Sequence, residues 1–99
     1  MDADDAVKTL AIEGPATIYE VAGLRDAFLR AMAEGRDLRV ELDGSTRWDL
    51  AGLQLLGSCA RTAQARGMRL TLAKVPRACV EAAERSGLSR WLESVTDRG

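Results

Sequence analysis

Two short stretches of the chain alternate strictly between apolar and polar residues. They cover residues 38–42 (LRVEL) and 68–72 (MRLTL), and in both of them every second residue is apolar. A period of two is typical of a strand that buries one face and leaves the other in water. A sheet covered on both faces would have continuously apolar strands, so we expect the helices to lie on one face only.

A third, less regular run at residues 7–12 also predicts a strand. Gly14 and Pro15 follow it as a turn signal and lead into a short extended piece at residues 16–18. The two pieces suit a hairpin at one end of the sheet.

Helical spacing of apolar residues marks two longer segments. Residues 19–34 carry one apolar stripe, and Gly35 follows as a terminator. Residues 50–66 carry another, with Asp49 placed to cap the start and Gly67 placed to end it. A helical wheel of this second segment divides its residues into an inward stripe (Leu53, Leu56, Ala60, Ala63) and an outward face (Gln54, Leu55, Ser58, Arg61).

The last part of the chain predicts a third helix, which begins at Pro76 and closes at Gly87. Val80 and Ala83 face inward in this prediction. An apolar pair then folds back as a final plug of the core: Trp91 and Leu92.

The order of these elements predicts the fold class. A strand, a helix and a strand within about 35 residues form a crossover unit, which leaves its two strands parallel. We therefore expect a single two-layer α/β domain over residues 1–99, with a mixed, mostly parallel sheet of about four or five strands and helices on one face.

Composition excludes several kinds of function. The 99 residues include no histidine and two cysteines, so histidine-based catalysis and a four-ligand zinc site are both excluded. Cys59 and Cys79 fall in helical patterns and are expected to be small core residues. We expect no cofactor and no metal.

Charge and hydropathy bear on partners and location. A net charge of −1 with interleaved signs argues against a nucleic-acid partner. The start of the chain is acidic where a secretory signal is basic, and no stretch is long and apolar enough to span a membrane. We therefore expect a cytoplasmic protein that is not embedded in a membrane.

The chemically most informative stretch covers residues 40–56 (VELDGSTRWDLAGLQLL). A strand ends there in a polar turn that delivers the chain to a helix N-terminus, where unpaired backbone N–H groups project. Such an end suits a phosphate switch or a contact with a partner protein.

The motif in this stretch resembles the STAS domain family, the fold of anti-sigma factor antagonists. In that family, an acidic-ended strand and a turn precede Asp-Ser/Thr-Ser/Ala/Gly-Gly-Leu at the start of a helix, and Asp49-Leu50-Ala51-Gly52-Leu53 occupies this place. The order and spacing of further matches extend the resemblance over nearly the whole chain: Ile12-Glu13-Gly14, Thr17-Ile18-Tyr19, Leu42-Asp43-Gly44, Ala65-Arg66-Gly67 and Pro76 through Leu88. Small single-domain STAS proteins of chemotaxis-type signalling operons look most similar.

One departure from the family pattern concerns its switch. In phosphorylated members, the residue after the motif aspartate is the Ser or Thr that receives the phosphate, and here it is Leu50. Leucine has no hydroxyl to phosphorylate and no charge to imitate a phosphate. The chain is therefore either locked in the binding-competent form, or Leu50 merely fills the first helical turn. Nearby hydroxyls that could be modified instead belong to Ser45, Thr46 and Ser58.

The resemblance implies a non-enzymatic regulatory module that binds a protein. The predicted contact residues lie in the turn and on the outward side of the second helix: Arg47, Trp48, Asp49, Leu50, Ala51, Gln54 and Leu55. Trp48 and Arg47 are residue types enriched at binding hot spots. The alternative for Trp48 is a place in the core beneath the loop.

The partner remains open at this point: an anti-sigma factor or kinase, a chemotaxis component, or a transporter ATPase. In the last case the chain would be an accessory subunit on a lipid-transport ABC ATPase. A phosphate-accepting receiver built on Asp43 and Lys74, and a nucleotide site at the helix N-terminus, are the remaining alternatives. Both are weakly supported because the strand-helix units are too few and no glycine-rich cradle is present.

Overall fold

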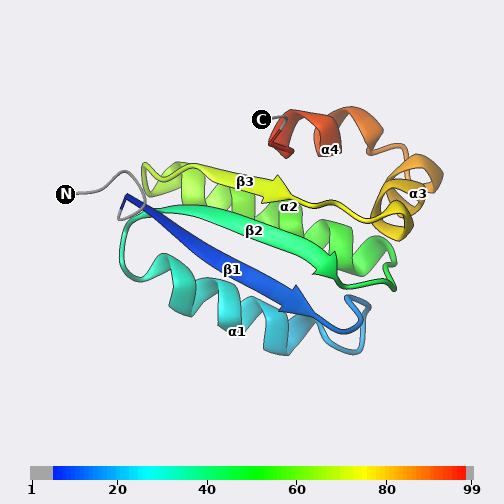
Figure 1. Ribbon diagram of the computed structural model, residues 1–99, viewed down its shortest axis with the longest axis horizontal. Coiled ribbons are helices and arrows are strands. Elements are labelled where there is room, and N and C mark those ends of the chain that lie inside the picture. Colours follow the sequence, from blue (N-terminus) through cyan, green and yellow to red (C-terminus); the bar gives the residue numbers. More distant parts are fainter. Residues whose placement is uncertain (1–5, 98–99) are drawn as a thin grey trace.

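The computed structural model describes residues 6–97. Three strands form one sheet in the order β1-β2-β3, and both neighbouring pairs are parallel (Figure 1). The strands are β1 (Val7–Glu13), β2 (Asp37–Gly44) and β3 (Leu70–Ala73). The helices are α1 (Val21–Met32), α2 (Leu50–Ala65), α3 (Arg77–Arg85) and α4 (Ser89–Val95).

The α/β class and the parallel pairing are confirmed, but the predicted number of strands is too high. Within residues 6–97 the sheet has three strands rather than four or five, and it is purely parallel. The predicted hairpin is the source of the difference. Residues 16–18 do not pair with β1; instead Ala16 makes a single parallel bridge to Trp48 after a bend at Gly14.

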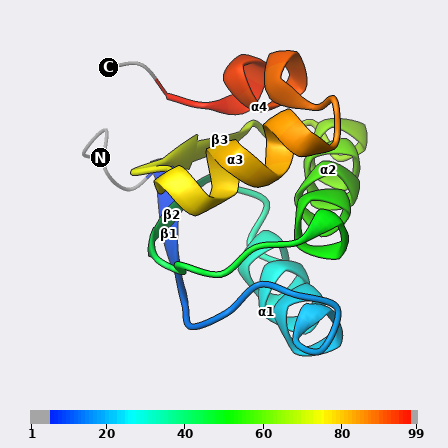
Figure 2. The ribbon, with the colours of Figure 1, turned by 90° about the vertical axis from the view of Figure 1, so that its right-hand side faces the viewer.

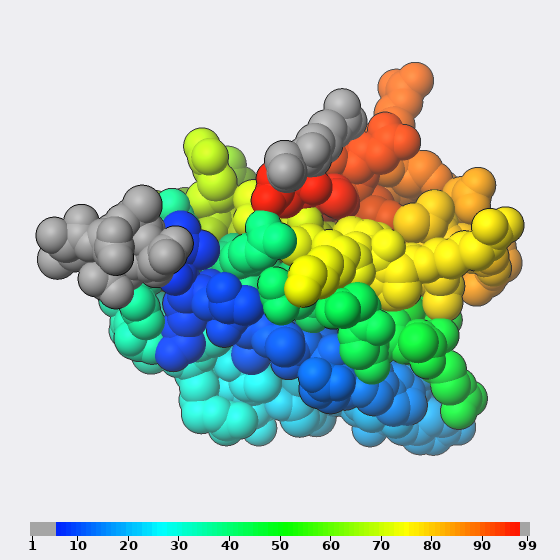
Figure 3. All heavy atoms as spheres, viewed as in Figure 1, coloured from blue at the N-terminus to red at the C-terminus, as the bar shows by residue number. Residues whose placement is uncertain are grey.

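The helices are distributed unevenly around the sheet, and one face has no helix over it within residues 6–97. Viewed along the strands, α1 and α2 lie together on one side of the sheet, while α3 lies at the carboxyl end of the strands and α4 lies beyond β3 (Figure 2). The opposite face is formed by strand side chains without a covering helix (Figure 3). The alternating strand pattern thus predicted the one-sided cover correctly.

Alternate residues of β2 supply the centre of the core. Leu38, Val40 and Leu42 are at most 1 % exposed, and the residues between them are only half-buried. Leu53 and Leu56 of α2 are buried against them, together with Phe28 and Met32 of α1. Burial of aliphatic side chains of this size stabilises the fold by about 1.5–3 kcal/mol each.

The helix ends follow the glycine signals of the sequence. Gly35, Gly67 and Gly87 have φ angles of +75°, +76° and +72°, a region that side chains with a Cβ rarely adopt. These three residues therefore terminate α1, α2 and α3 as predicted. No helix within residues 6–97 has the length and apolarity required to cross a bilayer.

The inward face of α3 differs from the prediction by one residue. Ala83 is buried as expected, but Val80 is 40 % exposed, because the helix turns Cys79, Ala82 and Ala83 toward the core. The predicted final plug is confirmed: Leu92 of α4 is 4 % exposed and Trp91 packs beside the core.

Both cysteines are buried core residues. Removal from water raises the pKa of the Cys59 thiol to about 11 and that of Cys79 to about 12, because burial penalises the thiolate. Both thiols therefore stay protonated at neutral pH, which makes them poor nucleophiles.

Candidate functional site

The carboxylate of Asp49 joins the start of α2 to the loop between β1 and α1. Its Oδ1 accepts a hydrogen bond from the backbone N–H of Gly52 at 3.0 Å, which caps the helix. Its Oδ2 accepts a second hydrogen bond from the backbone N–H of Ile18, also at 3.0 Å. One side chain thus holds together two segments that are 31 residues apart in the chain.

The same two segments touch through their backbones. The N–H of Ala16 donates to the carbonyl oxygen of Arg47 at 2.8 Å. On the other side, the carbonyl oxygen of Ala16 lies only 2.1 Å from the position that a Cβ on Gly52 would occupy. The glycine of the motif is therefore required for the close approach of the loop to the helix.

A compact turn before α1 points two apolar side chains outward. Oε1 of Glu20 accepts hydrogen bonds from the backbone N–H of Thr17 at 3.0 Å and from its hydroxyl at 2.5 Å. Between these two residues, Ile18 is 60 % exposed and Tyr19 is 90 % exposed. Tyrosine side chains are on average more buried than this, so the adjacent pair is a candidate contact surface.

Leu50 extends this exposed surface on the α2 side. It is 46 % exposed and directly follows Asp49, whose carboxylate holds Ile18. We call Ile18, Tyr19 and Leu50 the apolar ridge. Ile18 and Tyr19 were not among the predicted contact residues, and the available signal was a tyrosine, one of four aromatic residues, at the predicted start of the first helix.

The predicted contact residues divide between surface and core. Arg47 and Gln54 are exposed, and Asp49 and Ala51 are half-buried at the start of α2. Trp48 is 8 % exposed, and its Nε1–H donates to the carbonyl oxygen of Ser45 at 2.9 Å. Of the two alternatives for Trp48, its burial supports the place in the core beneath the loop.

Leu55 departs from its predicted outward position. It is half-buried and packs against the core at the edge of a groove between α1 and α2. The other outward residues of α2 are exposed as predicted: Gln54, Ser58 and Arg61.

Two hollows flank the apolar ridge. The first, of about 410 Å³, lies between Tyr19, the β2–α2 turn and α3, where Arg47 and Arg85 line it. The second, of about 510 Å³, is a groove between α1 and α2, lined by Ile18, Arg25 and Leu55 among others. The exposed side chains of the ridge, with a hollow on each side, form an uneven surface that a partner could contact.

Ser45 is the buried polar residue of the β2–α2 turn. It is fully buried, and its hydroxyl has no hydrogen-bond partner among the described residues. Its main chain is bonded: the N–H donates to Leu42 at 3.0 Å, and the carbonyl accepts from Trp48. Of the three hydroxyls considered for modification, this one is closed to a kinase in the folded chain, while Thr46 and Ser58 are exposed.

Ser45→Ala is expected to raise the free energy of unfolding by about 1 kcal/mol, because it removes an unpaired buried hydroxyl and keeps both main-chain hydrogen bonds. Urea denaturation measures the change, with Thr46→Ala at the exposed neighbour as a control that stays within about 0.5 kcal/mol. A loss of stability in Ser45→Ala would show that the hydroxyl is bonded in solution.

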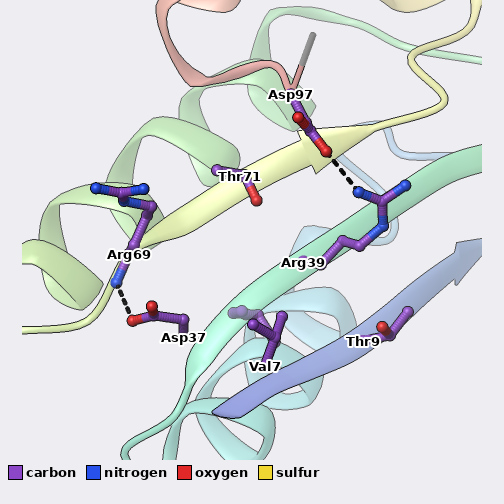
Figure 4. Close-up of a pocket in the computed structure, with 8 residues that line it drawn as sticks. Val7, Thr9, Asp37, Arg39, Arg69, Thr71 and Asp97 are labelled. Atoms are coloured by element: carbon purple, nitrogen blue, oxygen red, sulfur yellow. Dashed lines mark hydrogen bonds and ion pairs between the residues drawn. The ribbon is translucent and has the colours of Figure 1, made fainter. Parts of the chain in front are cut away.

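A further hollow, of about 500 Å³, lies on the open face of the sheet (Figure 4). Its charged groups satisfy one another: Arg39 pairs with Asp97 at 2.7 Å, and Asp37 accepts from the backbone N–H of Arg69 at 2.8 Å. The guanidinium of Arg69 points away from the Arg39–Asp97 pair (Figure 4). The groups around this hollow therefore converge less on a ligand than those around the ridge.

No group of three or more potential metal ligands occurs among residues 6–97. The ammonium of Lys74 lies 3.6 Å from the carboxylate of Glu41, so its ion pair is with Glu41 rather than with Asp43. The two residues of the receiver alternative are thus not paired.

The two-layer fold and the Asp49–Gly52 junction define a STAS-type α/β domain. The chain belongs to the STAS domain family: the family model described as "Mlab, STAS domain" matches residues 1–95. This family is one of protein-interaction and regulatory modules.

Among solved structures, the chain is similar to the crystal structure of a sulfate transporter family protein from Wolinella succinogenes. The TM-score is 0.73 at 22 % identity, and the match covers 92 % of this chain and 75 % of the other. At this identity the likeness shows the fold alone. No curated protein sequence matches the chain.

Proposed function

We propose that this chain is a non-enzymatic regulatory module that binds a partner protein through the apolar ridge and the exposed start of α2. The observation that carries the proposal is the 90 % exposure of Tyr19 beside Ile18 and Leu50, in a turn that hydrogen bonds hold in place. Exposed apolar groups on a fixed scaffold favour binding, because little conformational entropy is lost. Arg47, Asp49, Ala51 and Gln54 surround the ridge and complete the proposed surface.

In this proposal, the module cannot be switched by phosphorylation at position 50, because Leu50 occupies that position. The family's phosphoacceptor position carries no hydroxyl here, and the nearest helix N–H is already capped by Asp49. The module therefore corresponds to the unphosphorylated, binding-competent form at all times. Incubation with a kinase of the source cell and ATP should leave both its mass and its partner affinity unchanged.

A transporter-associated role is the second candidate. The matching family model is described as "Mlab, STAS domain", and small STAS proteins of this length also serve in lipid transport. This family membership supports an accessory subunit that docks on a transporter ATPase, with lipid transport as the particular case. An anti-sigma factor, a kinase or a chemotaxis component is the partner in the first candidate, and the same surface serves all of them.

Affinity capture from the source cell, with the intact chain as bait, identifies the partner. The decisive comparison uses Leu50→Asp, which places an unpaired carboxylate in the proposed interface. At a helix N-terminus the macrodipole tolerates this charge, so the fold should survive. Burying the charge in the interface should raise the dissociation constant by about 100-fold or more.

Val80→Asp is the matched control. Val80 is a similarly exposed apolar helix residue, at 40 % against 46 % for Leu50, and it lies on α3 outside the proposed surface. Circular dichroism checks the fold of both variants, and calorimetric titration measures their partner affinity. A folded Leu50→Asp variant that binds as tightly as the wild type would remove the start of α2 from the interface.

A further inference from the structure

The arginines around the apolar ridge lack ion-pair partners among the described residues. The first hollow is lined by two arginines, Arg47 and Arg85, and by two carboxylates, Asp49 and Glu81. Glu81 pairs with Arg77 at 2.8 Å, and Asp49 accepts hydrogen bonds from two backbone N–H groups, which occupy its two oxygens but leave its charge in place. The two lining arginines, in contrast, form no ion pair or side-chain hydrogen bond within residues 6–97.

The second hollow also contains an arginine without an ion-pair partner. Arg25 is its single charged lining residue among the part of the chain that the structure describes, and no carboxylate stands opposite it. The apolar ridge thus lies between unpaired guanidinium groups on both sides. Arginine offers a planar fork of N–H donors that matches a carboxylate in two parallel hydrogen bonds.

We propose that the partner presents an acidic amphipathic segment to this surface. Apolar side chains of that segment contact Ile18, Tyr19 and Leu50, and its Asp or Glu side chains pair with Arg47, Arg85 and Arg25. The inference rests on the proposed function and adds the chemistry of the partner. Complementary charge at the rim speeds association and selects among partners, while the apolar contact supplies most of the affinity.

An anionic membrane surface has the same charge, but the shape of the site favours a protein segment. The ridge has three apolar side chains and is bordered by a hollow on each side, which can receive individual side chains of a defined segment. A membrane contact of three side chains is marginal by comparison, because stable anchoring takes two strong signals.

The test uses two synthetic peptides of about 14 residues, a length at which helical spacing gives one apolar face. Both carry leucine on that face, and the rest of each peptide is glutamate in one and lysine in the other. Titration into the ¹⁵N-labelled chain is followed by NMR. The glutamate peptide should bind at least about tenfold more tightly, with shifts at Ile18, Tyr19 and Arg47, and salt should weaken it.

Charge reversal provides the internal control. Arg47→Glu combined with Arg85→Glu should reverse the preference, so that the lysine peptide binds more tightly. Arg90→Glu, which changes an exposed arginine of α4 away from the ridge, should leave the preference unchanged. Equal binding of the two peptides, a preference for lysine in the wild type, or shifts on another face would overturn the proposal.

Sedimentation with vesicles of anionic phospholipid tests the membrane alternative. Cosedimentation of the wild type, together with no binding of either peptide, would also overturn the proposal. Failure of the proposed function is distinguished by Leu50→Asp: if this variant keeps its partner, the surface itself is wrong. If Leu50→Asp loses the captured partner but the double arginine reversal does not, only the acidic chemistry of the partner is wrong.

Discussion

Gly52→Ala is expected to lower the free energy of unfolding by about 3 kcal/mol, a large effect for the addition of one methyl group. The new Cβ would lie 2.1 Å from the carbonyl oxygen of Ala16 and 3.0 Å from Cε3 of Trp48. The nearest atom belongs to the backbone, and the loop that carries it is tied to Arg47 and Asp49. Relief of the overlap therefore requires the loop and α2 to separate, which also displaces the apolar ridge.

Gly57→Ala in the same helix is the matched control. A Cβ at position 57 would meet Arg61 at 3.6 Å and Trp91 at 3.7 Å, which are ordinary van der Waals distances. Since alanine is the better helix former, this variant should gain up to about 1 kcal/mol. Urea denaturation of both variants measures the difference, and an equal response would mean that the loop does not pack against α2 in solution.

Leu53→Ala and Leu56→Ala are each expected to lower the free energy of unfolding by about 2–5 kcal/mol. Both side chains are at most 2 % exposed and lie in the core with β2, so truncation removes transfer free energy and leaves a cavity. Gln54 lies between them in sequence but is exposed, and Gln54→Ala should change stability by less than about 0.5 kcal/mol.

Denaturant titrations of the three variants check this pattern. The midpoint should shift in both leucine variants while the dependence on denaturant stays constant, which indicates unchanged denatured states. Similar losses at positions 53, 54 and 56 would contradict the assigned orientation of α2 on the sheet.

The sequence by itself determined the elements whose signal is local. Two patterns indicate which side of an element is buried: the period of two over residues 38–42 and the apolar stripe of α2. They do so because burial repeats with the geometry of the element itself. Gly35, Gly67 and Gly87 mark helix ends for an equally local reason, since each adopts a φ angle that other residues avoid. The motif from Asp49 to Leu53 placed the candidate site at the start of α2 before any contact was known.

The tertiary structure decided what depends on a distant neighbour. Residues 16–18 have the composition of a strand, but their partner is the segment at Trp48 rather than β1, so the predicted hairpin is replaced by one parallel bridge. Leu55 packs against the core although it was predicted to face outward, and Val80 is 40 % exposed although it was predicted to face inward. The apolar pattern of each helix alone predicts neither result.

The apolar ridge is the clearest case of this dependence. Ile18 and Asp49 are distant in the chain, and their segments are joined because the second oxygen of Asp49 accepts a hydrogen bond from the backbone of Ile18. A helix cap needs only one of the two carboxylate oxygens, so the motif predicts the cap and leaves the use of the other oxygen open. That second hydrogen bond, formed only in the folded chain, fixes the backbone of Ile18 beside the exposed Tyr19 of the proposed surface.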